Sequence, residues 1–292
     1  MLDYHLHLWP HDESSVECRL EQVAQYCDEA ARHGVTELAL TEHAFRFRDV
    51  LTTVGPFWQR WGHEPTSSLM VEYFDFHAKN SLEEYVTFAQ AAKDAGLPVK
   101  IGLEVDYYEG HMPAISALLE QYPFDVLIGS VHWLRTWQFD DLDNVDQMAQ
   151  WHRQDVATVW DAYATAFDEL TSSRVVDVVA HPDVIKVAGF VPPTTDDIWD
   201  RMAESAQRAN VVVECSSAGW FKPVGEQYPA GGLLDRFVAA GLDFTTASDA
   251  HRRERVGARS ADLATLLEAR GVNHLASFTN RQKSLVPLRS NA

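Results

Sequence analysis

Cysteine and positive charge are both scarce in this chain of 292 residues. The 3 cysteines, Cys18, Cys27 and Cys215, are odd in number and lack CxxC spacing, which predicts reduced thiols rather than a disulfide framework. The 24 lysines and arginines are outnumbered by 43 acidic residues, which gives a net charge of −19. A nucleic-acid-binding surface needs a basic stripe, so this composition argues against a nucleic-acid partner.

Long apolar runs are also missing. No run reaches the roughly 18 residues that would indicate a transmembrane helix. The chain opens on Asp3-Tyr4-His5, without the basic segment and apolar stretch of a signal peptide. We therefore expect a cytoplasmic protein with no membrane partner.

Short β-rich runs alternate with amphipathic helical segments, a pattern that indicates an α/β barrel of parallel strands. Such barrels commonly reach this length undivided, and no linker interrupts the pattern, so we expect a single domain over residues 1–292. The predicted strands are 2–8, 36–42, 99–106, 125–132, 175–181, 211–216 and 243–248. The predicted helices are 16–33, 81–95, 111–121, 145–172, 196–209, 230–240 and 260–270. An eighth strand is possible near 273–278, and the long irregular stretches 44–80 and 216–229 are predicted to form lids or substrate walls.

Metal-binding side chains recur where the predicted strands end. A single histidine at a strand end is usually structural, but His5-x-His7 and Asp249-x-His251 each place two ligands on one side of a strand. In a barrel these ends converge on one face. Imidazole and carboxylate together suit zinc, iron or manganese, and such ions allow an acidic protein to bind an anionic substrate. The pattern predicts a polynuclear metallohydrolase centre formed by His5, His7, His43, Glu104, His132, His181, Asp249 and His251.

Three segments carry a more specific resemblance: Gly129–Asp140, Lys222–Pro229 and Ala247–His251. Over about residues 2–285 the sequence resembles the polymerase and histidinol phosphatase (PHP) superfamily of metal-dependent phosphoesterases, and within it the histidinol-phosphatase branch. The resemblance implies a distorted (β/α)7 barrel with two or three divalent ions at the carboxyl ends of the strands. It also implies hydrolysis of a small phosphate ester, with L-histidinol phosphate as the expected substrate.

The resemblance also assigns ligands to three metals. It implies a first metal held by His5, His7, Glu104 and Asp249, a second that shares Glu104 with His132 and His181, and a third held by His43, His251 and one more histidine. The family spacing places that last histidine at position 13, which is Glu13 here. His11 lies two residues earlier, and we favour it over Glu13; the alternative is that His11 is an exposed loop residue and the third site is weak.

Catalytic and substrate-binding roles follow from the same set. We expect Glu104 to bridge two metals, and Asp249 or His251 to deliver a proton to the leaving group through bound water. No nucleophile motif is present, so our hypothesis is that metal-activated hydroxide attacks phosphorus directly. The candidate phosphate-binding cations are Lys222, Arg252 and Arg46.

Two points of the substrate assignment stay open. Phe221 stands where the family often has an arginine, so one phosphate contact is lost. Lys222 could bind phosphate or pair with Glu226 on the surface. A PHP phosphoesterase that acts on another small ester is therefore the main alternative, ahead of an amide-hydrolysing barrel or a non-catalytic metal-binding module. The oligomeric state is not predicted.

Overall fold

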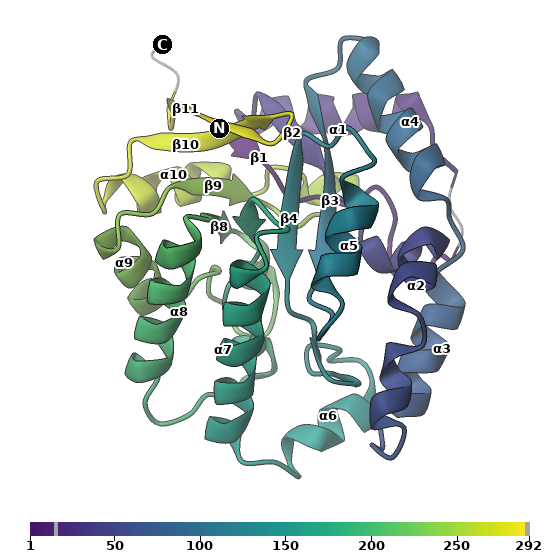
Figure 1. Cartoon of the computed structure of the whole chain (residues 1–292). Helices are drawn as coiled ribbons and strands as arrows, with labels where there is room; N and C mark the ends of the chain where they lie inside the picture. Colours follow the sequence, from purple (N-terminus) through teal and green to yellow (C-terminus); the bar gives the residue numbers. More distant parts are fainter. Residues whose placement is uncertain (15–16, 290–292) are drawn as a thin grey trace.

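Seven parallel strands form a barrel at the centre of the molecule (Figure 1). The computed structural model describes residues 1–14 and 17–289. In barrel order the strands are β1 (Leu2–Asp3), β2 (Glu37–Leu40), β3 (Val99–Asp106), β4 (Val126–Ser130), β7 (Val178–Val179), β8 (Val212–Ser216) and β9 (Phe244–Ala247). The backbone N–H of Tyr4 donates to the carbonyl of Thr246 at 2.9 Å, and Leu6 pairs with Ala250, so the first and last strands meet and the barrel is nearly closed. The seven predicted strands are confirmed in their predicted order.

Helices cover the outside of the barrel (Figure 1). They are α1 (Leu20–Arg32), α2 (Arg48–Val54), α3 (Ser67–His77), α4 (Leu82–Asp94), α5 (Met112–Leu119), α6 (Val145–Trp151), α7 (Val156–Ser172), α8 (Asp196–Ala209), α9 (Gly231–Ala239) and α10 (Ser260–Glu268). Short 3-10 turns are η1 (Ala44–Arg46), η2 (Phe57–Trp61), η3 (Val184–Ala188), η4 (Ala218–Phe221) and η5 (Arg253–Arg255). Of the helices in the described ranges, none combines the length and apolar character needed to cross a bilayer.

Local sequence signals explain several helix boundaries. The hydroxyl of Ser81 accepts the backbone N–H of Glu84 and begins α4, as an N-cap residue does. The predicted helix 145–172 is two helices, because Asp155 caps a new start by accepting the N–H of Thr158. Residue 16, where the first predicted helix begins, lies outside the described residues.

The stretch 44–80 is helical, so its prediction as an irregular loop is wrong. It contains η1, α2, η2 and α3. Aromatic residues of α3 pack in more than one direction: Phe74 contacts Trp58, while Tyr73 contacts Phe45 and Trp133. Because the apolar side chains do not share one stripe, the stretch shows no helical periodicity in the sequence.

The predicted eighth strand exists, but it does not belong to the barrel. β10 (His274–Thr279) pairs antiparallel with β11 (Gln282–Pro287) and forms a hairpin at the amino ends of the barrel strands (Figure 1). The backbone N–H of Phe278 donates to the Tyr4 hydroxyl at 3.0 Å, and that of Asn280 donates to the Asp125 carboxylate at 3.1 Å. The hairpin therefore covers the end of the barrel opposite to the carboxyl ends of its strands.

Candidate metal centre

Four ligand atoms of the expected first metal site meet near the carboxyl ends of the barrel strands, where Glu104 lies in β3 and the other three residues follow β1 and β9. The Nε2 atoms of His5 and His7 lie 3.1 Å apart. The Glu104 Oε2 atom lies 3.4 Å and 3.6 Å from them, and the Asp249 Oδ1 atom lies 3.6 Å and 3.4 Å from them. In a tetrahedral site with bonds of about 2.0–2.1 Å, neighbouring ligand atoms lie about 3.3–3.4 Å apart. The ligand atoms of His5, His7 and Asp249 are close enough to share one divalent ion, and Glu104 lies beside both imidazoles.

Glu104 also reaches a second group of ligands with its other oxygen. Its Oε1 atom lies 3.2 Å from Nε2 of His181 and 3.6 Å from Nε2 of His132. Glu104 is completely buried, and its Oε2 atom also lies 2.5 Å from Nδ1 of His43. One carboxylate with an oxygen in each group is the arrangement of a bridging ligand.

A third group of imidazoles lies on the other side of His7. The ligand atoms of His7, His43 and His251 are close enough to share one ion, and the Nε2 atoms of His43 and His251 lie 3.3 Å apart. The ring of His11 is 4.8 Å from that of His43 and 4.6 Å from that of His251, between ring centres. His11 lines the cavity above the centre, whereas Glu13 does not. This placement supports His11 over Glu13.

The protonation states of Glu104, Asp249, His7 and His251 suit metal binding. Although burial favours neutral acids, the surrounding histidines hold the pKa values of Glu104 and Asp249 well below their ordinary range. Burial lowers the pKa of His7 to about 4 and that of His251 to about 3. Ionised carboxylates and neutral imidazoles are the forms that bind a divalent ion.

Two ligands are held by carboxylates that the sequence reasoning did not identify. Glu214 accepts the Nδ1–H of His5 at 2.9 Å, and Asp106 accepts that of His132 at 2.8 Å. These contacts leave the Nε2 atoms of both rings free to face Glu104. Burial opposes a charge on either ring, but the nearby carboxylates raise the pKa of His5 well above its ordinary value and that of His132 to about 10. A metal ion bound by either ring would displace a proton from it.

Asp3 holds the segment that carries the last two ligands. Its carboxylate accepts the backbone N–H of Ser248 at 2.8 Å, the Ser248 hydroxyl at 2.6 Å and the N–H of Gly257 at 2.8 Å.

The candidate ligands Asp249 and His181 have left-handed backbones, with φ of 51° and 23°. Such conformations are strained in residues other than glycine, and they concentrate at functional sites.

A cavity of about 710 Å³ opens above the ligand groups. Among the described residues that line it, Lys222 is the one lysine or arginine. Carboxylates from Asp140, Asp141 and Asp143 line the same cavity, as does Tyr228. The structure thus places Lys222 where sequence analysis expected a phosphate-binding cation.

The other two candidate cations lie elsewhere, and the expectation for Arg46 is corrected. Arg46 is completely buried, and its guanidinium donates to the carbonyls of Glu13 and Pro10, both at 2.7 Å. Its Nε atom also lies 3.5 Å from Glu42. Arg46 therefore holds the loop that carries His11 and has no group directed at a substrate. Arg252 is exposed and does not line the cavity.

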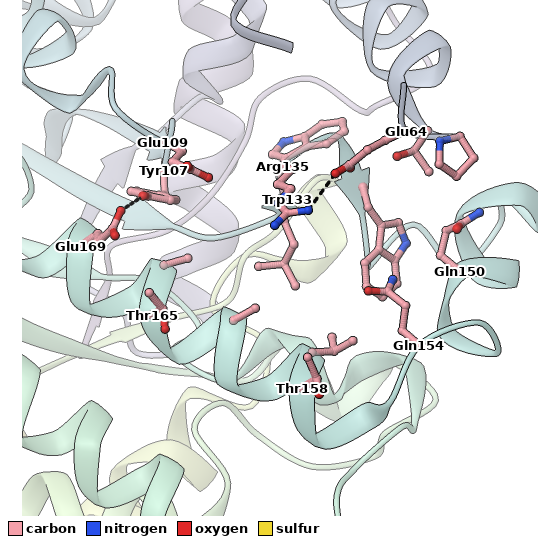
Figure 2. A pocket seen from close by; sticks show the side chains of 17 residues that line it. Glu64, Tyr107, Glu109, Trp133, Arg135, Gln150, Gln154, Thr158, Thr165 and Glu169 are labelled. Atoms are coloured by element: carbon pink, nitrogen blue, oxygen red, sulfur yellow. Dashed lines mark hydrogen bonds and ion pairs between the residues drawn. The ribbon is translucent and has the colours of Figure 1, made fainter. Parts of the chain in front are cut away.

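A second cavity of about 600 Å³ lies on the other side of Trp133 (Figure 2). Arg135 donates to Glu64 at 2.9 Å, and the Tyr107 hydroxyl donates to Glu169, so two of the carboxylates that line this cavity already have partners. No histidine or cysteine lines it among the residues that the structure describes. Among the residues that the structure describes, the groups that could hold a metal ion consist of His5, His7, His43, Glu104, His181, Asp249 and His251.

Comparison with known proteins decides the family. The PHP domain family matches residues 3–218.

The chain belongs to the PHP domain family.

A curated relative, the probable histidinol-phosphatase of Deinococcus radiodurans, is 32% identical over 185 residues, which cover 62% of this chain and 69% of that protein. The histidinol phosphate phosphatase of Lactococcus lactis, solved with zinc, L-histidinol and phosphate, superposes with a TM-score of 0.67 at 20% identity, covering 97% of this chain and 98% of that one. A putative histidinol phosphatase from Listeria monocytogenes superposes with a TM-score of 0.69 at 17% identity, covering 90% and 99%. At these identities the two structures confirm the PHP-type fold.

Proposed function

We propose that this chain is a phosphomonoesterase that uses two or three divalent ions to hydrolyse L-histidinol phosphate to L-histidinol and phosphate. The observation that carries the proposal is the position of Glu104, with one carboxylate oxygen in each of two ligand groups below a cavity that contains Lys222. The curated D. radiodurans relative supports the substrate by its name, and the L. lactis complex with zinc, L-histidinol and phosphate supports it by its contents.

The ligand groups supply what phosphate-ester hydrolysis requires. Divalent ions bound here would activate water near neutral pH and neutralise charge on the phosphoryl oxygens. Glu104 would hold neighbouring ions together, and Glu214 and Asp106 orient the rings of His5 and His132. Zinc, iron and manganese all accept this mixed set of nitrogen and oxygen ligands.

Direct attack of water on phosphorus is the step that the cavity supports. No serine, threonine or cysteine lines it among the described residues, so the usual hydroxyl and thiol nucleophiles are absent from its described wall. A leaving alkoxide needs a proton. Asp249 and His251 both line the cavity, and their proposed part is to pass that proton through water.

The distribution of charge in the cavity fits a substrate with both signs of charge. L-Histidinol phosphate carries an anionic phosphate at one end and an ammonium group near the other. Lys222 offers a point charge for the phosphate, and the carboxylates of Asp140, Asp141 and Asp143 attract a cation. The aromatic ring of Trp133 in the same wall can pack against an imidazole.

A PHP phosphoesterase with another small phosphate ester is the second candidate, and Phe221 favours it. The Phe221 side chain is 42% exposed, does not line the cavity, and has the Arg255 guanidinium 3.8 Å from its ring centre. This position therefore supplies no phosphate contact, in contrast to the arginine that the family resemblance implies. An amide-hydrolysing or non-catalytic role fits less well, because the ligand set of the phosphoesterase pattern is nearly complete.

A substrate panel tests the assignment. Phosphate release is measured for L-histidinol phosphate, p-nitrophenyl phosphate and a set of sugar and nucleotide monophosphates, with manganese or zinc supplied. We expect the highest kcat/KM for L-histidinol phosphate. An equal or higher kcat/KM for another ester would transfer the assignment to the second candidate, and no hydrolysis of any ester would reject both.

A further inference from the structure

Lys186 is a buried lysine directly behind the wall of the metal cavity. It lies in η3, and only 3% of its surface is exposed. Its ammonium donates to the Glu226 carboxylate at 2.9 Å and to the Gln227 carbonyl at 2.7 Å, and it lies 3.1 Å from the Asp183 carboxylate. All three of its N–H groups therefore have an oxygen partner, as a charged buried lysine requires.

The contacts of Lys186 join two segments that both reach the cavity. Asp183 follows the metal ligand His181, and its carboxylate also accepts the backbone N–H of Ala230 at 2.8 Å. The segment 222–229 lies on the other side of the ammonium, which is 5.1 Å from the ring centre of Tyr228. Lys186 and Asp183 together hold this segment against the residues that follow His181.

The same contacts determine which partner Glu226 takes. A turn closed by the N–H of Gly225 and the carbonyl of Lys222 at 3.0 Å places Glu226 just after Lys222. One Glu226 oxygen binds Lys186, and the other accepts the N–H of Gly231 at 3.3 Å. Within the described part of the chain Lys222 forms no ion pair, although it lines the cavity. The alternative in which Lys222 pairs with Glu226 is therefore not what the structure shows.

We propose that Lys186 is a positioning residue for phosphate recognition, which holds Glu226 away from Lys222 and so keeps the Lys222 ammonium available to the phosphate. The inference rests on the proposed phosphatase function and adds to it a residue that does not touch the substrate. Without Lys186, the Glu226 carboxylate keeps the N–H of Gly231 but loses its charged partner. Because it lies four positions after Lys222 in the chain, it then competes with the phosphate for the Lys222 charge.

Steady-state kinetics of the metal-loaded protein with L-histidinol phosphate tests this role. In Lys186→Met we expect KM for the ester and the inhibition constant of inorganic phosphate to rise about tenfold, because a charge-assisted contact is diverted. The value of kcat and the metal content should stay near those of the unaltered protein. In Lys186→Met/Glu226→Gln both constants should return toward the original values, since no carboxylate remains to compete. Glu226→Gln alone should change little, and Lys186→Arg should keep most of the function.

A matched control separates positioning from general loss of stability. Lys93 binds the buried carboxylate of Asp125 at 2.7 Å near the opposite end of the barrel. Lys93→Met should lower the melting temperature and leave KM unchanged. If Lys186→Met does not fold, the double variant Lys186→Met/Asp183→Asn removes both members of the buried charge pair. The KM of this double variant is then compared with and without Glu226→Gln.

Two results would overturn the inference: an unchanged KM in Lys186→Met, or a raised KM that Glu226→Gln fails to lower. Calorimetric titration of the metal-loaded variants with inorganic phosphate compares their phosphate affinities directly, without turnover. Failure of the unaltered protein to hydrolyse any phosphate ester would reject the proposed function alone, and the titration would still judge the role of Lys186.

Discussion

Replacing Glu214 by glutamine tests whether the carboxylates behind the ligands control metal affinity. One Glu214 oxygen accepts the Nδ1–H of His5 at 2.9 Å, and the other accepts the backbone N–H of His181 at 3.0 Å. The amide nitrogen of glutamine cannot accept, so one of two buried N–H groups loses its partner. An unsatisfied buried donor costs about 1–3 kcal/mol, and removing such a carboxylate typically weakens metal binding about 10–100-fold. We expect Glu214→Gln to fold and to bind metal more weakly by about that factor.

Competition with a chromophoric chelator measures the affinity, and thermal unfolding of the metal-free protein measures stability. Asp125→Asn is the matched control, because Asp125 is also buried and accepts the backbone N–H groups of Ile101 at 3.0 Å and Asn280 at 3.1 Å at the opposite end of the barrel. It should lower stability without changing metal affinity. The reasoning is refuted if Glu214→Gln binds metal as tightly as the unaltered protein, or if Asp125→Asn weakens binding equally.

Three further predictions concern the ligands and the cavity wall. Lys222→Gln should raise KM for the phosphate ester about tenfold or more in initial-rate assays while the metal content is retained, and an unchanged KM would exclude Lys222 from phosphate binding. Metal affinity should fall as the pH falls from 8 to 6, by about tenfold per pH unit for each proton displaced. The reason is that the raised pKa values of His5 and His132 keep these rings protonated without metal. An affinity that does not depend on pH in chelator competition would contradict this prediction. Gly219→Ala should lower the melting temperature by several degrees, because a Cβ there collides with the carbonyl oxygen of Glu226. A calorimetric scan that shows no change would contradict the close approach of Gly219 to Glu226.

The barrel and the convergence of the candidate ligands were predictable because metal-binding residues interrupt apolar runs at one repeated place. Six of the seven predicted strands, all except 211–216, have a histidine, aspartate or glutamate in their last two positions or continue directly into one, and parallel strands bring those ends together. His5 and His7 lie beyond the short β1 strand, yet their Nε2 atoms still converge, since the extended backbone continues through the bridge at Leu6. For these residues position along the chain was sufficient.

Residues whose role depends on a partner distant in sequence were not predictable. Glu214 lies inside a strand whose apolar neighbours dominate the pattern, and its contact with His5 spans 209 positions. Lys186 belongs to no motif, and its proposed role depends on its contact with Glu226, 40 positions away. Arg46 was one of the candidate phosphate-binding cations, but its guanidinium turns toward backbone carbonyls of the first loop. Pairings of this kind appear only when the fold is known.

The most direct test of the account is phosphate release from L-histidinol phosphate measured against the number of metal ions per chain. We predict no release from protein stripped with a chelator, and a rise with added zinc, iron or manganese that levels off at two or three ions per chain. Release that persists in the stripped protein, or no release from the fully loaded protein, would contradict the account.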